Sequence, residues 1–171
     1  GFKGTSMEEV VQTIGVTRGA LYHHFKGKEG LFQAVFEDAL GEINDRCVKA
    51  FNQSADPWDQ LILTTRAFFE ACIDPEIQQI VLVDAPAILG MSVWRQHDEN
   101  KTMAVLKEIL NNLTTKKIIR PLNLEPLAHT IWGATSELAI WISHTDDPRK
   151  SLEDGLNTII EIFKALKIDN G

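Results

Sequence analysis

The chain has 171 residues, 44% of them hydrophobic, so it can bury a sizeable core within one or two domains. Its most apolar run, Ile80 to Val83, falls far short of the roughly eighteen residues that a membrane span needs, which excludes a spanning helix. The formal net charge of −7 is uneven: residues 1–30 hold four basic and three acidic residues, a net of +1, which leaves −8 for residues 31–171. This asymmetry is typical of a protein in which only one end contacts phosphates.

The segment 6–28, which reads SMEEVVQTIGVTRGALYHHFKGK, has the pattern of two short helices joined by a tight turn. Ser6 can cap a first helix over about 6–13, whose apolar residues recur at helical spacing. Gly15 then suits a left-handed turn, and Thr17 can cap a second helix over about 17–24. Two helices joined by a glycine-containing turn of a few residues predict a helix-turn-helix.

The second of these helices has the composition of a helix that enters a groove of DNA. Arg18 carries a guanidinium suited to guanine edges or phosphates, and the small Gly19 and Ala20 allow a close approach of the backbone. The alternative is an ordinary solvated helix end whose core face is formed by Leu21 and Phe25. The predicted DNA-binding residues, including donors for phosphates along the rim, are Ser6, Thr17, Arg18, Gly19, Ala20, Tyr22, His23, His24 and Lys28.

The first forty or so residues resemble the DNA-binding end of the tetracycline-repressor (TetR) family of bacterial transcription regulators. The shared signature comprises Thr-Ser-Met, Gly-Val-Thr, Leu-Tyr-His-His-Phe and then Lys-x-Gly-Leu-Phe at the start of a long helix. The remaining residues resemble the family mainly in length and helical layout. Family members begin with a further amphipathic helix, so the resemblance implies that this chain starts after it, in the loop at Gly1, and lacks one wall of its DNA-binding domain.

Prolines and acids mark the helix starts in the rest of the chain. Asp56-Pro57, Asp74-Pro75 and Asp147-Pro148 each place a capping acid before a proline, and no alternating strand pattern appears between them. We therefore predict an all-α fold whose further helices span about 28–52, 57–72, 75–82, 91–113, 124–144 and 148–167.

Two domains are expected. Residues 1–30 form the helix-turn-helix DNA-binding domain, incomplete at its N-terminus, and it continues into the long helix over 28–52. Residues 31–171 form a larger helical domain for ligand binding and dimerisation. Because the helix over 28–52 enters both domains without a cluster of proline or glycine, it should couple them mechanically.

The last two predicted helices favour a homodimer. Between Leu127 and Ser143 the only formally charged residue is Glu137, and a helix that is apolar nearly all round is buried on both sides. One side can face the core of its own chain and the other a second copy, as the family resemblance also implies. The alternative is a monomer whose core hides both faces. The predicted interface residues are Leu127, Ile131, Leu138, Ile142, Leu156, Ile159 and Phe163.

No catalytic, metal-binding or cofactor-binding set is visible. The five histidines show no HExxH spacing, and GxSxG, P-loop and GxGxxG motifs are absent. Cys47 and Cys72 have no CxxC spacing, so buried thiols in a reducing cytoplasm are expected. We therefore predict a protein that is not an enzyme and that needs neither a metal nor a cofactor.

The aromatic residues of the predicted ligand-binding domain can form a core or line a cavity for a flat, apolar molecule. Each one alone is more often packing, but the resemblance favours a cavity, since relatives hold an inducer between these helices. Glu137 is costly on a doubly buried helix unless it is hydrogen-bonded, so it and His97 are candidate polar contacts. The predicted ligand residues are Phe69, Trp94, His97, Met103, Trp132 and Glu137.

These patterns together favour a cytoplasmic, nucleoid-associated repressor that binds a palindromic operator in double-stranded DNA as a homodimer. A small apolar or aromatic effector is expected to release it. The alternatives are an activator or a ligand-independent regulator of the same fold, a small helical enzyme or carrier, and a purely structural dimerisation module. The helix-turn-helix argues against the enzyme and the structural module.

Overall fold

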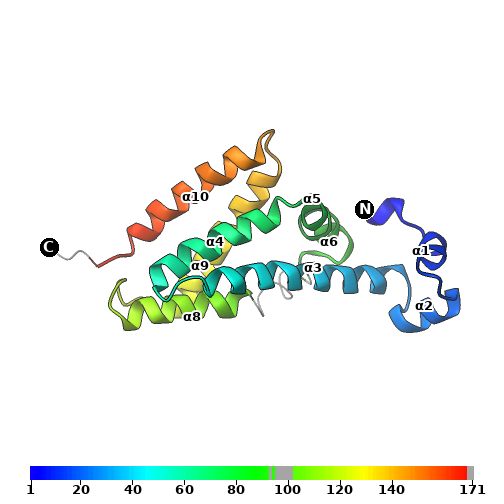
Figure 1. Cartoon of the computed structure of the whole chain (residues 1–171), viewed down its shortest axis with the longest axis horizontal. Helices are drawn as coiled ribbons and strands as arrows, with labels where there is room; N and C mark the ends of the chain where they lie inside the picture. Colours follow the sequence, from blue (N-terminus) through cyan, green and yellow to red (C-terminus); the bar gives the residue numbers. More distant parts are fainter. Residues whose placement is uncertain (93, 95–101, 169–171) are drawn as a thin grey trace.

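The computed structural model describes residues 1–92, 94 and 102–168, which form an elongated helical molecule (Figure 1). The predicted all-α fold is confirmed, since the only β contact in the described residues is an isolated bridge between Ile119 and Lys167. The elements are η1 (Phe2–Gly4), α1 (Met7–Ile14), α2 (Arg18–Phe25), α3 (Lys28–Phe51), α4 (Pro57–Cys72), α5 (Pro75–Ile77), η2 (Gln78–Asp84), α6 (Ala85–Ile88), α8 (Thr102–Thr115), α9 (Leu124–Ser143) and α10 (Pro148–Lys164).

One long helix, α3, connects the two ends of the molecule. The short helices α1 and α2 lie at its N-terminal end, away from the other helices of the chain (Figure 1). The helices α4 and α8 pack against α3, while α9 and α10 cover α4. The helix-turn-helix and the remaining helices, which we call the body, are therefore joined by a continuous rod.

The body helices begin at the capping residues that the sequence predicts. Asp56 accepts hydrogen bonds from the backbone N–H groups of Trp58 at 2.8 Å and Asp59 at 3.1 Å. The same kind of cap is made by Asp74, Asn123 and Asp147 at the starts of α5, α9 and α10. Because a cap satisfies N–H groups that the first turn leaves unpaired, these starts are determined locally.

The body contains two hydrophobic clusters that meet at α4. The larger cluster lies between α4, α8, α9 and α10 and includes the fully buried Phe69 and Phe163. The smaller cluster lies between α3, η2 and α6 and includes Phe36 and Trp94. The ring of Phe68 packs against both clusters, so it lies on the boundary between them.

A π-helix occupies Gln78–Asp84, where the sequence predicts an ordinary helix over 75–82. In a π-helix the carbonyl of Val81 would accept from the amide five residues on, which belongs to Pro86 and has no N–H. The indole N–H of the buried Trp94 donates to this carbonyl instead, at 2.8 Å. A side chain remote in sequence thus supplies the donor that the local backbone lacks.

Candidate functional site

The N-terminal end forms the predicted helix-turn-helix. The Ser6 hydroxyl accepts from the Glu9 N–H at 3.1 Å, and the Ser6 N–H donates to the Glu9 carboxylate at 2.9 Å, a bond that lowers the pKa of Glu9. Gly15 ends α1 with a φ of 71°, in the left-handed region that glycine tolerates best. The Thr17 hydroxyl accepts from the Ala20 N–H at 3.2 Å. Ser6 and Thr17 therefore cap the two helices.

Most of the surface of α2 is open to solvent. Its exposed residues are Arg18, Gly19, Ala20, Tyr22, His23 and His24, while Leu21 is buried and anchors the opposite face. An Arg18 nitrogen lies 3.0 Å from the Glu8 carboxylate, and its guanidinium lies 5.3 Å from the centre of the Tyr22 ring. Both partners of this ion pair are more than half exposed, so the pair is weak and Arg18 can exchange it for a phosphate or a base.

Gly19 has no internal packing reason to be glycine. A β-carbon built there would meet no atom within 4 Å. The residue is inside α2, where alanine is the more stable choice. A glycine here leaves room for the close approach of another molecule to the backbone of α2.

The first residues of the chain join the DNA-binding end to the body. The Phe2 N–H donates to the Asp84 carboxylate at 2.8 Å, and the Phe2 ring packs edge-on against Phe32 with centroids 5.2 Å apart. The Lys28 ammonium lies 4.3 Å from the centre of the Phe2 ring. Lys28 is partly buried at this junction, whereas the other predicted DNA-binding cation, Arg18, is exposed on α2.

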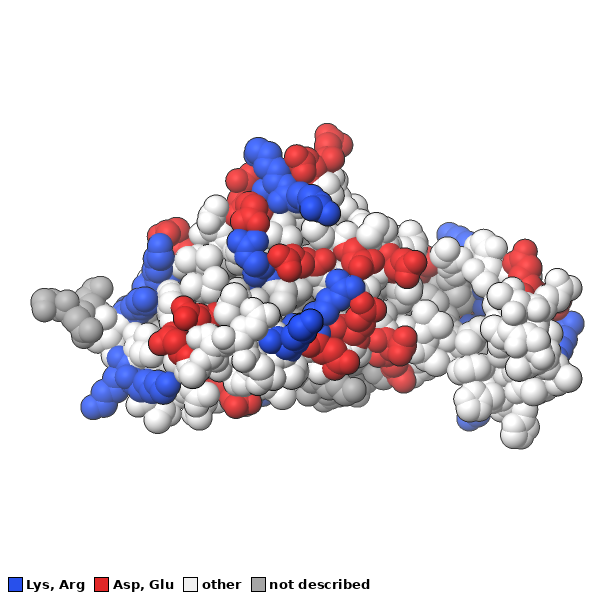
Figure 2. Space-filling view, viewed as in Figure 1, with Lys and Arg blue, Asp and Glu red and all other residues white. Residues whose placement is uncertain are grey.

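On the face shown in Figure 2, acidic side chains with basic ones among them cover the body, whereas the end that carries α1 and α2 is mostly uncharged. This distribution agrees with the net of +1 on residues 1–30 and −8 on residues 31–171. An acidic body is repelled by phosphates, so a polyanion is directed to the helix-turn-helix end.

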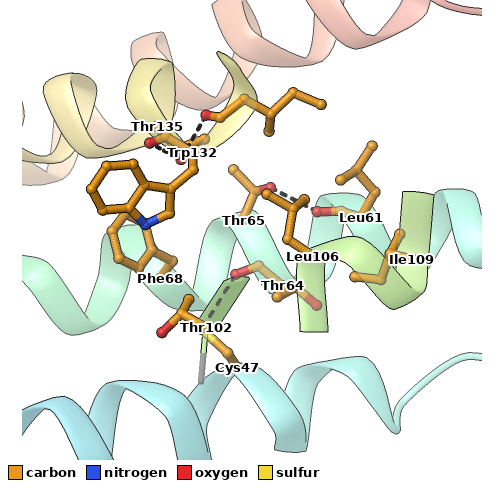
Figure 3. A pocket seen from close by; sticks show the side chains of 11 residues that line it. Cys47, Leu61, Thr64, Thr65, Phe68, Thr102, Leu106, Ile109, Trp132 and Thr135 are labelled. Atoms are coloured by element: carbon orange, nitrogen blue, oxygen red, sulfur yellow. Dashed lines mark hydrogen bonds between the residues drawn. The ribbon is translucent and has the colours of Figure 1, made fainter. Parts of the chain in front are cut away.

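The surface carries two wide hollows, of about 760 Å³ beside α4 and α10 and of about 310 Å³ beside α1 and α3. Two small cavities lie between the body helices. The larger, of about 40 Å³, lies between α3, α4, α8 and α9 (Figure 3). Its lining comprises Cys47, Leu61, Thr64, Thr65, Phe68, Thr102, Leu106, Ile109, Ile131, Trp132 and Thr135. The smaller, of about 10 Å³, is lined by Leu40, Ile43, Phe68, Cys72, Val81, Leu82, Trp94, Ser136 and Ala139. Phe68 lines both cavities, and none of the described lining residues carries a charge.

The structure brings only two of the predicted ligand residues to these cavities. Trp132 lines the larger cavity and Trp94 the smaller one. Phe69 and Met103 are buried in the larger hydrophobic cluster and line neither cavity. For Phe69 the reason is the rotation of α4, which turns Phe68 toward the cavities and its neighbour Phe69 into the core.

The structure does not bring the predicted polar contacts to the cavities. Glu137 is exposed on the outside of α9 in the single chain and lines neither cavity, and His97 lies outside the described residues. The polar atoms found at the cavities are different ones. Three of them are buried and have no hydrogen-bond partner, namely the hydroxyls of Thr64 and Ser136 and the indole N–H of Trp132. Sequence reasoning missed both hydroxyls, because hydroxyls on helices usually bond to their own helix.

The predicted dimer residues occupy the inner face of α9 and α10. Leu138 is partly buried and packs against the chain's own core. The other six are buried in that core, namely Leu127, Ile131, Ile142, Leu156, Ile159 and Phe163. These side chains therefore hold α9 and α10 onto the body and do not face a second copy. The outer face carries Gly133, Glu137 and Trp141 on α9, and Ile162 on α10. Trp141 is 48% exposed and Ile162 is 53% exposed.

Both cysteines, Cys47 and Cys72, are buried and make no disulfide. Within the described ranges, no group of three or more His, Cys, Asp or Glu residues is placed to hold a metal ion. The helices of those ranges also lack the combination of length and apolar character that crossing a membrane requires.

Two family models match the sequence. The model described as bacterial regulatory proteins of the tetR family matches residues 1–35, which hold α1, α2 and the start of α3. The model described as a tetracyclin repressor-like C-terminal domain matches residues 58–166, which include nearly all of α4 and the later helices. The chain belongs to the TetR family.

Individual relatives agree with this assignment. The HTH-type transcriptional regulator AcrR of Shigella flexneri is 41% identical over 113 residues, which are 66% of this chain and 49% of that protein. The HTH-type transcriptional repressor KstR2 of Mycolicibacterium smegmatis is 30% identical over 84 residues, which are 49% of this chain and 41% of that protein. The chain thus spans half the length of these curated relatives or less.

A solved structure matches over a longer range. The crystal structure of a TetR-family transcriptional regulator from Pectobacterium atrosepticum superposes with a TM-score of 0.86 at 31% sequence identity. The match covers 99% of this chain and 86% of that chain. The arrangement of helix-turn-helix, long α3 and helical body is therefore that of the family.

Proposed function

We propose that this protein is a transcriptional repressor that binds a palindromic operator as a homodimer and leaves it when a small effector occupies the body. The observation that carries this proposal is the exposed face of α2, where Arg18 stands beside Gly19 and Ala20, which add almost no bulk. Its family membership supports the proposal, and so does its similarity to the transcriptional regulator AcrR and the transcriptional repressor KstR2. It would act in the cytoplasm, on the nucleoid.

The geometry of α2 fits reading in the major groove. A groove about 12 Å wide admits a helix, and the missing bulk at Gly19 lets the backbone approach the base edges. Arg18, at the first turn of α2, can donate two hydrogen bonds to a guanine in this arrangement. Tyr22, His23 and His24 follow on the exposed face and can donate to phosphates, which position the protein without reading sequence.

The outer face of α9 and α10 is the proposed dimer interface. Gly133, Glu137 and Trp141 recur at four-residue spacing on α9, so they form one stripe on the outside of that helix. Exposed large apolar side chains such as Trp141 and Ile162 are typical of the centre of an interface. A β-carbon at Gly133 would meet nothing within 4 Å, which leaves room for a helix of the second copy.

Release by an effector follows from the separation of the two recognition helices. Two α2 helices must lie roughly 34–36 Å apart to enter successive major grooves on one face of the duplex. An effector that binds a body conformation with another separation lowers the population able to bind DNA. A coupling of about 1–3 kcal/mol already changes operator affinity by roughly 5- to 150-fold.

The test is selection of duplexes from a random pool, followed by fluorescence anisotropy titrations at several salt concentrations. The selected sequences should share a palindrome, and Arg18→Ala should weaken binding to it by about 5- to 150-fold, the cost of about 1–3 kcal/mol for one base contact. Arg149→Ala removes the same charge from the exposed part of α10 and should leave affinity nearly unchanged. A pool without a shared sequence, or equal losses in both variants, would contradict the proposal.

A further inference from the structure

We propose that the Phe68 ring is a displaceable plug, and that the effector replacing it is an uncharged, mainly apolar molecule with at least one hydrogen-bond acceptor. The acceptor binds the indole N–H of Trp132, and the hydroxyls of Thr64 and Ser136 supply further hydrogen bonds. This inference rests on the proposed function, since it specifies the chemistry and the entry of the effector.

The polar atoms at the cavities carry the first step. The described residues contain three buried side-chain N or O atoms without a hydrogen-bond partner, and they belong to Thr64, Trp132 and Ser136. All three residues line one of the two cavities that share Phe68. Unpartnered buried polar groups are rare because they destabilise the fold, and each one calls for a specific explanation. Their gathering around one ring is explained by a ligand that pairs with them.

Neighbouring hydroxyls show that the lack of a hydrogen-bond partner is particular to these three residues. Thr65 donates to the Leu61 carbonyl at 2.7 Å, and Thr135 donates to the Ile131 carbonyl at 3.0 Å, so both are satisfied by their own helices. The Thr64 hydroxyl lies on the same helix as Thr65 but has no such bond. The helix therefore does not prevent a hydroxyl from being satisfied, and the unpaired groups remain available to a ligand.

The position of Phe68 carries the second step. Thr64 and Phe68 are four residues apart on α4, and Trp132 and Ser136 are four residues apart on α9, so each pair lies along one helix face. In the view of Figure 3 the Trp132 indole and the Phe68 ring overlap, and the Thr64 side chain comes from the same helix as Phe68. Phe68 shares one cavity with Thr64 and Trp132 and the other cavity with Ser136.

Volume explains why the ring must move. Cavities of about 40 Å³ and 10 Å³ hold little more than water, whereas an engineered cavity that binds benzene measures about 150 Å³. Phe68 is only partly buried and lies at the boundary of two clusters, while Phe69 beside it is fully buried in one of them. Displacement of the Phe68 ring joins the two cavities and uncovers the unpaired groups.

The lining determines the class of ligand. The described residues at both cavities are uncharged, and an ion buried without a partner is strongly disfavoured, so these residues favour a neutral ligand. The Trp132 indole can only donate, which requires an acceptor such as a carbonyl or ether oxygen on the ligand. The hydroxyls of Thr64 and Ser136 can donate or accept, so a ligand hydroxyl is also matched.

The test uses calorimetry on the full chain with three probes of similar shape: 1-indanone, indane and indane-2-carboxylate. The ketone should bind roughly 5- to 10-fold more tightly than the hydrocarbon, which is the usual net effect of one hydrogen bond. The carboxylate should bind much more weakly than both. Phe68→Ala should tighten binding of the two neutral probes, because the space is then already open.

The decisive variant is Trp132→Phe, which should abolish the preference for 1-indanone while leaving the affinity for indane nearly unchanged. Trp58→Phe, a tryptophan of α4 that lines neither cavity, is the matched control and should keep the preference. Equal binding of ketone and hydrocarbon in the wild type, a preference that survives Trp132→Phe, or no binding even after Phe68→Ala would overturn the inference. Operator binding is titrated separately, so any of these results with intact DNA binding refutes the plug and leaves the regulator standing.

Discussion

Replacement of Trp94 by phenylalanine tests whether one buried indole holds the π-helix that contacts the DNA-binding end. In this π-helix the Ala85 N–H donates to the Ile80 carbonyl, and the next donor in register is missing at Pro86. The Trp94 indole supplies it to Val81 at 2.8 Å, and Trp94 is only 5% exposed.

The magnitude follows from these contacts. Leaving the Val81 carbonyl buried without a partner costs about 1–3 kcal/mol. Shrinking a buried indole to a phenyl ring adds about 1 kcal/mol for the space that it leaves. The expected loss of about 2–4 kcal/mol is a large share of the roughly 5–15 kcal/mol that stabilises a typical domain. For a chain of this size it lowers the melting temperature by about 4–16 °C.

The assay is urea and thermal unfolding followed by circular dichroism. Trp58→Phe is the control, because Trp58 is partly exposed and its ring contacts the Lys167 ammonium at 3.8 Å. Pro86→Ala adds an amide N–H where the π register needs one, so it should recover about 1 kcal/mol in the Trp94→Phe background. A loss below about 0.5 kcal/mol for Trp94→Phe, the level of an ordinary surface change, would refute the reasoning. So would a loss that Pro86→Ala does not reduce.

Three further predictions address other parts of the chain. Gly19→Ala should stabilise the fold by about 0.5–1 kcal/mol in urea unfolding while weakening operator binding in anisotropy titrations, and unchanged binding would contradict the close approach. Trp141→Glu should give a folded monomer in sedimentation, whereas Ile131→Glu should unfold the chain; a dimeric Trp141→Glu variant would exclude the outer face as the interface. Arg46 lowers the pKa of Asp74, so their ion pair stabilises the fold above the ordinary carboxyl range near about pH 4 and loses this effect as the pH falls through the lowered pKa. In the Arg46→Met variant the melting temperature should therefore fall less steeply with decreasing pH than in the wild type. An equal dependence of melting temperature on pH in both proteins would contradict this.

Local chemistry is what the sequence predicts well. The caps at Ser6, Thr17 and Asp56 each pair with an N–H two or three residues away, so their partners are visible in the sequence itself. The left-handed end of α1 at Gly15 is equally local. The π-helix could not be predicted in this way, because its stabilising donor, Trp94, lies thirteen residues from the Val81 carbonyl.

The rotation of a helix that is apolar on two sides is what the sequence does not determine. On α9, the stripe with Ile131 and Ile142 and the stripe with Gly133 and Trp141 are both compatible with burial. The structure turns the first stripe into the chain's own core. Glu137 marks the outer stripe, since a lone carboxylate is better tolerated at a partly hydrated interface than in a core. The rotation of α4 is equally undetermined by the sequence, which is why the sequence predicts Phe69 rather than Phe68 at the cavity.

The path from the cavity to DNA requires only a small movement. Cys47 lines the larger cavity and Lys28 begins the same helix, nineteen residues earlier, so α3 extends about 28 Å between them at 1.5 Å per residue. A tilt of about 5° at the cavity moves the start of α3 by about 2.5 Å, and opposite shifts in two subunits change the separation of the α2 helices by about 5 Å. This is a large fraction of a groove about 12 Å wide. The hydrogen bond from the Phe2 N–H to the Asp84 carboxylate joins the DNA-binding end to η2. Val81, in the same π-helix, lines the smaller cavity together with Phe68. Under the proposed mechanism, a molecule no larger than a few rings therefore acts on both connections at once when it takes the place of the Phe68 ring.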